Sequence, residues 1–167
     1  ADLVAAARRA EPRCGGTRVI LIDGPAGSGK TTLAGRLAEV LDCQVLHGDD
    51  MYEGWDGLAT LWNIERQILE PLAEGQSGRF RRWDWYESQR AEEIVVPPAN
   101  FVILEGVGVA SPEARAYAGL VLWIEAPWDV CLERGMARDG VGMRDEWVAF
   151  HETERIVHHI GGTRAAA

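Results

Sequence analysis

The stretch IDGPAGSGKTTL, residues 22–33, interrupts an apolar run with a glycine-rich turn and then a lysine. Fixing the backbone of such a turn is entropically costly, so we expect a function to require it. The preceding run RVILID, residues 18–23, is continuous and rich in β-branched residues, as in a buried strand. After the turn, Leu33, Leu37 and Leu41 recur at helical spacing. The sequence therefore predicts a strand, a turn and a helix in succession.

The turn matches the phosphate-binding pattern G-x-x-x-x-G-K-[ST] at Gly24, Gly29, Lys30 and Thr31. Glycines let successive backbone N–H groups face a phosphate, and the helix N-terminus adds the positive end of its dipole. Lys30 is expected to reach the outer phosphates, and the Thr31 hydroxyl to bind Mg²⁺. A plain glycine turn with a surface lysine is the alternative, which the spacing and context disfavour. The expected nucleotide-binding residues are Gly24, Pro25, Ala26, Gly27, Ser28, Gly29, Lys30, Thr31 and Thr32.

Composition and charge restrict the class of protein. The sequence has 167 residues, 47% of them apolar and 26% charged, which fits a single domain over residues 1–167. The formal net charge of −9 and the pI near 4.9 argue against nucleic acid or an anionic membrane as a partner. We therefore expect a small-molecule partner, with no nucleic acid and no membrane.

The cysteines and the apolar runs indicate a compartment. Cys14, Cys43 and Cys131 lie far apart and form no C-x-x-C pair, which predicts neither a disulfide framework nor a zinc site. No apolar run approaches the ~20 residues of a membrane span, and residues 1–13 lack the order of a signal peptide. A cytoplasmic location fits these features best.

Alternating helical and strand patterns predict the rest of the fold. Beyond the first strand and helix, the expected strands lie within residues 43–50, 100–106 and 119–126. The expected helices cover residues 2–10, 58–75, 128–139 and 146–159. Pro71 and Gly75 are expected to stop the second of these helices, and the last helix is expected to be polar. This alternation predicts an α/β fold, a three-layer αβα sandwich with a mostly parallel sheet.

One segment departs from this alternation. Residues 76–98 contain GRFRRWDWYESQRAEEIVVPP, in which polar and apolar residues alternate, so we expect a hairpin-like excursion between the second and third parallel strands. Arg79, Arg81 and Arg82 either guide an anionic substrate or belong to an exposed hairpin of alternating charge. Both interpretations stay open from the sequence.

Acidic residues follow two of the expected strands. Asp49 and Asp50 come where the second strand ends, and Glu105 ends the third. Ligands bind at that edge of a parallel sheet, so one aspartate is a candidate base and Glu105 a candidate magnesium acid. The alternatives are a solvated acidic loop that caps the next helix and a surface glutamate at a strand end.

The helix over residues 128–139 carries two arginines four residues apart, Arg134 and Arg138. Residues at this spacing share a helix face and could close over a transferring phosphoryl group. Arginine suits this role because its planar fork meets phosphate oxygens in pairs. An ordinary solvated helix face is the alternative.

A phosphate-binding turn does not by itself name a reaction, because GTPases, motor ATPases and small-molecule kinases all use it. No N-K-x-D stretch for guanine recognition occurs, and no long insertion suits a mechanical ATPase. Small-molecule phosphoryl transfer is therefore the leading hypothesis. A non-catalytic ATP sensor is the alternative, although it has little need of a base beside the phosphates.

The segments GPAGSGKTTL, GDDMY, RWDWYESQR, PPANFVILEG and DVCLERGMARD occur in the order found in the uridine kinase family. This family includes pantothenate kinase and phosphoribulokinase among its relatives, and the resemblance covers roughly residues 18–139. It implies a P-loop kinase fold, ATP and Mg²⁺ as cofactors, and a hydroxyl acceptor. It also implies a lid over about residues 129–142.

The resemblance also implies roles for individual residues. Asp49 falls on the base of the family and Tyr52 on its acceptor-contacting tyrosine. Its acceptor-side segment falls on Trp83, Asp84, Trp85 and Arg90. Thr31, Asp49 and Glu105 are the implied magnesium ligands. The implied lid arginines are Arg134 and Arg138.

Two departures from the family pattern matter. Members that hold uracil place a histidine shortly after the acceptor-side segment, where this sequence has Ser88 and Gln89. The family also adds a fifth strand after the lid, whereas this sequence ends in GGTRAAA. We therefore expect a nucleoside or nucleoside-like acceptor without strong pyrimidine preference, with a pantothenate-like or sugar acceptor as the alternative. Trp83 is expected to offer its ring to the acceptor, and Trp62 to pack within its helix.

Overall fold

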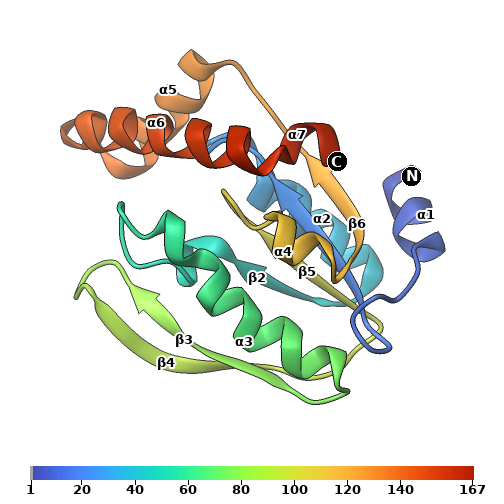
Figure 1. The fold of residues 1–167 in the computed structure, drawn as a ribbon. Helices are drawn as coiled ribbons and strands as arrows, with labels where there is room; N and C mark the ends of the chain where they lie inside the picture. The colour runs from blue at the N-terminus through green and yellow to red at the C-terminus, as the bar shows by residue number, and fades with distance from the viewer. Residues whose placement is uncertain (1) are drawn as a thin grey trace.

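A computed structural model describes residues 2–167 of the chain. At its centre is a parallel sheet of four strands in the order β2-β5-β1-β6. The strands are β1 (Arg18–Asp23), β2 (Gln44–His47), β5 (Phe101–Glu105) and β6 (Ala118–Trp123). Figure 1 shows helices on both sides of this sheet and a separate two-stranded hairpin. The predicted α/β class with a parallel sheet is confirmed.

Both faces of the sheet are buried. In β1, Val19 and Leu21 belong to one buried apolar cluster. Ile20 and Ile22, which alternate with them, belong to a second cluster on the opposite face. Parallel strands covered on both faces contain continuous apolar runs, and this explains the sequence of β1.

The helices divide between these two faces. The face of Ile20 and Ile22 is covered by α1 (Asp2–Arg9) and α2 (Lys30–Leu41). The other face is covered by α3 (Leu61–Ala73), α4 (Pro112–Arg115) and α6 (Arg144–Gly161). The remaining helices are η1 (Gly48–Asp50), η2 (Leu58–Thr60), α5 (Trp128–Asp139), η3 (Val141–Met143) and α7 (Thr163–Ala166). None of the helices within residues 2–167 is both long enough and apolar enough to cross a bilayer.

The helix α3 ends between the two residues that were predicted to stop it. Pro71 lies inside its last turn, and the helix ends at Ala73. Gly75 then adopts a positive φ of 74° and donates its N–H to Leu72 O at 3.0 Å. A left-handed residue just after a helix satisfies the last free carbonyl groups, which explains the glycine.

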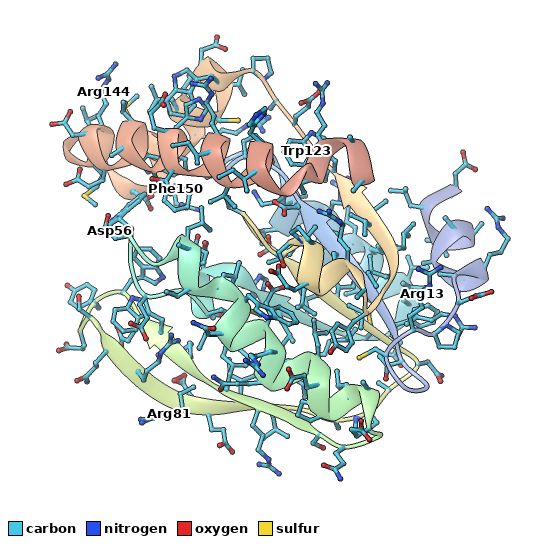
Figure 2. The ribbon with its side chains drawn as sticks, in the orientation of Figure 1. Arg13, Asp56, Arg81, Trp123, Arg144 and Phe150 are labelled. Atoms are coloured by element: carbon cyan, nitrogen blue, oxygen red, sulfur yellow. The ribbon has the colours of Figure 1, made fainter. Side chains whose placement is uncertain are left out.

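The excursion over residues 76–98 is an antiparallel hairpin, as predicted. It consists of β3 (Gly78–Asp84) and β4 (Gln89–Val96). Arg79 pairs across the strands with Glu93 at 3.0 Å, and Arg82 with Glu92 at 2.7 Å. Figure 2 shows the labelled Arg81 on the outer side of the hairpin. These contacts match the alternating-charge interpretation of the arginines.

A fully buried carboxylic acid lies on the inner face of α3. Glu65 is 0% exposed, and within residues 2–167 neither of its carboxylate oxygens has a hydrogen-bond partner. Burial, followed by the charges of Asp23 and Glu113, raises the pKa of Glu65 well above its ordinary value of 4.5. The folded protein therefore favours the protonated form.

We expect Glu65→Gln to raise the free energy of unfolding, by an amount that grows with pH. The pKa of Glu65 is higher in the folded state than in the unfolded state. Its contribution to stability is therefore complete below the unfolded pKa, and it is lost as the pH rises toward the folded pKa. Over that window the wild type loses up to about 1.4 kcal/mol per pH unit relative to the variant. Urea unfolding at about pH 5 and about pH 8 measures the difference. Glu70→Gln, on the exposed side of α3, is the control, and a gain independent of pH would contradict the expectation.

Candidate active site

The loop between β1 and α2 has the backbone that its glycines were predicted to supply. Gly24, Gly27 and Gly29 all have positive φ angles, of 145°, 79° and 107°. A Cβ on Gly27 would lie 2.6 Å from Cys131 O of α5, so a side chain there would displace α5. Residues with side chains would be strained or would clash in this loop. Its glycines leave the backbone N–H groups free to surround a phosphate.

Lys30 begins α2 and lies beneath this loop. It is the only lysine in the sequence, and it is 6% exposed. Its Nζ donates to Pro25 O at 2.7 Å. Burial lowers the pKa of Lys30, and the charges of Glu105 and Asp23 counteract this. The ammonium group therefore lies between the loop and a group of carboxylates.

Two of the three expected magnesium ligands lie side by side. Thr31 Oγ1 donates to Glu105 Oε1 at 3.2 Å, and His47 Nδ1 lies 2.6 Å from the same oxygen. The hydrogen bond to Glu105 raises the pKa of His47, although burial partly opposes it. Asp49, the third expected ligand, follows β2 in η1, and β2 pairs with β5 at His47 and Glu105.

These donors fit Mg²⁺ bound together with a phosphate. A hydroxyl and a carboxylate supply the oxygen ligands that Mg²⁺ prefers, and the ion usually completes its shell with phosphate and water oxygens. Within residues 2–167, no cluster of three or more His, Cys, Asp or Glu side chains forms a cage for a metal without substrate. The Thr31 hydroxyl and the Glu105 carboxylate suit a magnesium ion that also binds phosphate oxygens.

Aromatic residues donate hydrogen bonds to both the side chain and the backbone of Asp49. The Tyr52 hydroxyl donates to Asp49 Oδ1 at 2.6 Å, and the Trp85 indole Nε1 donates to Asp49 O at 2.7 Å. Burial raises the pKa of Tyr52 well above 10, so the phenol keeps its proton and remains a donor. Burial also raises the pKa of the neighbouring Asp50, against the charge of His47.

The three acceptor-side residues shape the far end of the hairpin. The Arg90 guanidinium lies 5.4 Å from the centre of the Trp83 ring, and Arg90 Nη2 donates to Glu53 at 3.1 Å. The Asp84 carboxylate accepts from the backbone N–H groups of the turn at residues 86–87. The structure thus brings Trp83 and Arg90 together and places Asp84 at the turn.

A cluster of aromatic residues connects the candidate base Asp49 with α6. Trp85 meets Tyr52 edge-on at 6.0 Å and Trp55 at 5.6 Å between ring centres. Trp55 in turn meets Phe150 at 5.6 Å and Trp147 at 6.1 Å, both from α6. Figure 2 shows the labelled Phe150 on the side of α6 toward the labelled Asp56. Trp62 packs outside this cluster, against Tyr117, which agrees with its predicted packing role.

The two lid arginines take different positions. Arg134 Nη1 donates to Gly27 O of the phosphate loop at 3.0 Å. Arg138 pairs with Asp139 at 3.0 Å. This hydrogen bond raises the pKa of Arg138, and the charge of Asp49 adds to the effect. Arg134 therefore contacts the loop, while Arg138 lies within electrostatic reach of the candidate base.

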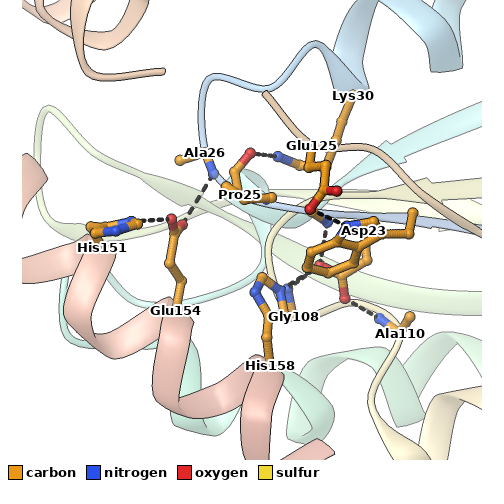
Figure 3. Close-up of polar contacts among 12 residues, drawn as sticks. Asp23, Pro25, Ala26, Lys30, Gly108, Ala110, Glu125, His151, Glu154 and His158 are labelled. Atoms are coloured by element: carbon orange, nitrogen blue, oxygen red, sulfur yellow. Dashed lines mark hydrogen bonds and ion pairs between the residues drawn. The ribbon is translucent and has the colours of Figure 1, made fainter. Parts of the chain in front are cut away.

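Asp23 is a site residue that the sequence analysis missed. It ends β1 directly before the loop and is fully buried. Its carboxylate accepts from the backbone N–H groups of Gly24, Gly108 and Ala110 at 2.7, 2.9 and 2.9 Å. His158 Nε2 of α6 lies 2.8 Å from Asp23 Oδ1 (Figure 3). A charged residue at the buried end of a strand was the signal in the sequence.

The prediction that the last helix is polar was wrong for one of its faces. Trp147, Phe150 and Glu154 of α6 are buried. They recur at intervals of three and four residues, the spacing of a helix face that packs against the domain. This pattern was readable in the sequence, but the charged residues between its members obscured it.

The parallel sheet with helices on both faces and the glycine-rich loop between β1 and α2 give the chain the three-layer α/β fold of P-loop NTPases. No family model matches the chain. A shikimate kinase of Francisella tularensis subsp. holarctica is 30% identical over 122 residues, or 71% of this chain and 63% of the relative. A uridine kinase of Borrelia duttonii is 27% identical over 143 residues, or 73% of this chain and 67% of the relative. The chain thus spans less than two thirds of the length of the shikimate kinase.

Two solved structures share the fold. A protein of Bacillus stearothermophilus described as a possible uridine kinase has a TM-score of 0.57 and 21% identity, covering 83% of this chain and 84% of its own. A protein of Silicibacter sp. TM1040, named for a suggested role as a fructose transport system kinase, has a TM-score of 0.63 and 18% identity, covering 98% and 89%. The two structures show the fold alone, and the similarity to the curated uridine kinase agrees with the resemblance carried by the motifs.

Proposed function

We propose that the chain is an ATP- and Mg²⁺-dependent kinase that transfers the γ-phosphoryl group to a hydroxyl of a nucleoside or nucleoside-like small molecule. The observation that carries the proposal is the position of Asp49 beside the phosphate cradle. It follows β2, which pairs with β5, and β5 ends at Glu105 in contact with Thr31 of the loop. A candidate base and a phosphate site thus share the carboxyl ends of neighbouring strands, where α/β sheets bind ligands.

The nucleotide side of the site consists of the loop, Lys30 and the lid. Loop N–H groups and the start of α2 would hold the phosphates, and Lys30 would reach the outer ones. Arg134 and Arg138 would stabilise charge on the phosphoryl group. Thr31, Asp49 and Glu105 would offer oxygen ligands to Mg²⁺, which neutralises phosphate charge when bound.

Asp49 is the proposed general base. Its carboxylate would accept the proton of the acceptor hydroxyl, which must lie within ~3 Å of it. Tyr52 and Trp85 fix the carboxylate and the backbone of Asp49. A base held in one orientation needs little reorganisation before proton transfer.

The acceptor would lie between Asp49 and the hairpin, with Trp83, Asp84, Arg90 and Tyr52 as its neighbours. A hydroxylated sugar or pantothenate-like metabolite is the second candidate acceptor. It is favoured by Ser88 and Gln89, which stand where uracil-binding relatives have a histidine, and by the names of the relatives. Those names mention shikimate, uridine and fructose, which all contain a ring and several hydroxyl groups.

One experiment tests both candidates and the alternative of an ATP sensor. Release of ADP from Mg-ATP is measured with a panel of nucleosides, sugars, cyclic hydroxy acids and vitamins. We expect ADP release to depend on one class of hydroxylated acceptor. ATP binding without ADP release for any member of the panel would favour the sensor.

We expect Trp83→Ala to raise the acceptor KM by about fivefold and to leave the ATP KM unchanged, because an aromatic face contributes about 1 kcal/mol to ring binding. We also expect uridine not to be strongly preferred over other hydroxylated acceptors. Steady-state kinetics across the panel measure both quantities, with Trp62→Ala as the control. An unchanged acceptor KM in Trp83→Ala would assign Trp83 to hairpin packing with Arg90.

The proposed setting is the reducing cytoplasm, with neither nucleic acid nor membrane as a partner. The thiols of Cys14, Cys43 and Cys131 are free, which supports a reducing compartment. The formal net charge of −9 disfavours polyanionic partners.

A further inference from the structure

One face of α6 contacts three parts of the candidate active site. Phe150 stacks on Tyr52 beside the candidate base, at 6.1 Å between ring centres. One turn later, Glu154 contacts the phosphate loop, and His158, a turn beyond, contacts Asp23. Residues four apart share a helix face, so these contacts come from one continuous surface.

Glu154 makes a contact that packing alone does not require. It is 1% exposed, and its Oε2 accepts from the Ala26 backbone N–H at 3.0 Å (Figure 3). Its Oε1 lies 3.0 Å from His151 Nδ1, and the His151 ring stacks on Trp128 at 3.9 Å. Burying a carboxylate is unfavourable unless hydrogen bonds compensate, and here both oxygens are engaged.

The Ala26 contact is one of several that hold the phosphate loop at successive residues. Lys30 donates to Pro25 O, and Arg134 donates to Gly27 O. Between them, Glu154 accepts from the Ala26 N–H. The glycines of the loop give its backbone much freedom, so without such contacts the loop would populate many shapes. Groups that hold a binding site in its bound shape reduce the ordering that the ligand must pay for.

We propose that Glu154 is a positioning residue for the nucleotide: it fixes the Ala26 peptide, and with it the phosphate loop, in the shape that accepts the triphosphate. His151, stacked on Trp128, orients the Glu154 carboxylate. The inference rests on the proposed function only in that the loop binds Mg-ATP. It assigns α6 to the nucleotide site, although Glu154 follows Ala26 by 128 residues in the chain.

The test compares Glu154→Ala, Glu154→Gln and His151→Phe with the control Glu152→Ala, an exposed position on the same helix. Direct binding of Mg-ATP is measured by calorimetry, and thermal unfolding is followed in parallel. We expect Glu154→Ala to weaken ATP binding by about tenfold, the equivalent of one lost charge-assisted hydrogen bond. Glu154→Gln keeps an oxygen for the Ala26 N–H and should stay within about threefold of the wild type.

His151→Phe keeps the ring stack on Trp128 but removes the nitrogen that contacts Glu154. It should weaken ATP binding by about threefold, since the carboxylate remains but loses one of its two fixed partners. This variant also tests the inference if Glu154→Ala does not fold. The acceptor KM should stay unchanged in each variant, which separates positioning of the loop from a general loss of structure.

Three outcomes would overturn the inference. The first is an unchanged ATP affinity in both Glu154→Ala and His151→Phe. The second is tighter ATP binding in Glu154→Ala, which would show that the carboxylate competes with phosphate. The third is an equal loss of affinity for ATP and for the acceptor. Failure of the proposed function is a separate result, because the wild type would then bind no Mg-ATP or release no ADP.

Discussion

Replacing Lys30 by alanine should lower kcat by about 10³-fold and weaken ATP binding, because the variant loses the only ammonium group beside the phosphate loop. The arginines of α5 are not equivalent replacements, because a guanidinium is a planar fork and an ammonium group is a compact point charge. The fold should persist, because the substitution also removes a charge that is unfavourably buried. ADP release, ATP binding and thermal unfolding measure the three effects.

Arg36→Ala, on an exposed position of α2, is the matched control for Lys30→Ala. It removes a positive charge from the same helix without touching the loop, so it should retain wild-type kinetics. Near wild-type ADP release by Lys30→Ala would contradict the assignment of a kinase.

Asp49→Asn should lower kcat by about 10²- to 10⁴-fold with little change in ATP affinity, because it removes a proton acceptor and keeps the shape of the side chain. The amide oxygen can still accept from the Tyr52 hydroxyl, and the contact from Trp85 is to the backbone. The active-site geometry should therefore survive. Kinetics at saturating acceptor, together with direct ATP binding, measure the two quantities.

Asp50→Asn is the control for this second substitution, because it changes the adjacent carboxylate in the same short helix. It should have the milder effect. The reverse order of effects would show that Asp50 is the base and that Asp49 supports it.

The sequence predicts those parts of the site that depend on residues close together in the chain. The loop pattern sets Gly24, Lys30 and Thr31 within one strand-turn-helix unit, so spacing alone specifies their geometry. The strand-end position of Glu105 is also local, because a buried apolar run ends there. The family resemblance adds Asp49, which local patterns leave undecided against Asp50.

The parts that could not be predicted depend on contacts between distant segments. Glu154 and Ala26 are 128 residues apart, and no local pattern pairs them. The role of Trp85 was hidden for a different reason. Strand β3 ends at Asp84, so Trp85 lies in the turn, where side-chain alternation no longer predicts direction. The sequence placed both tryptophans on the acceptor-side segment and favoured Trp83, while Trp85 is the tryptophan that contacts Asp49.

Lys30, the single lysine of the chain, differs chemically from the arginines near the site. All the other Lys and Arg residues of the chain are arginines, whose planar guanidinium binds best in a fixed orientation. The lysine ammonium group is a point charge with rotatable donors on a four-carbon stem. Arg134 and Arg138 are anchored by the partners described above. In the proposed reaction, Lys30 would therefore supply a compact point charge beside the phosphate loop, and the arginines would supply planar donors with a fixed orientation.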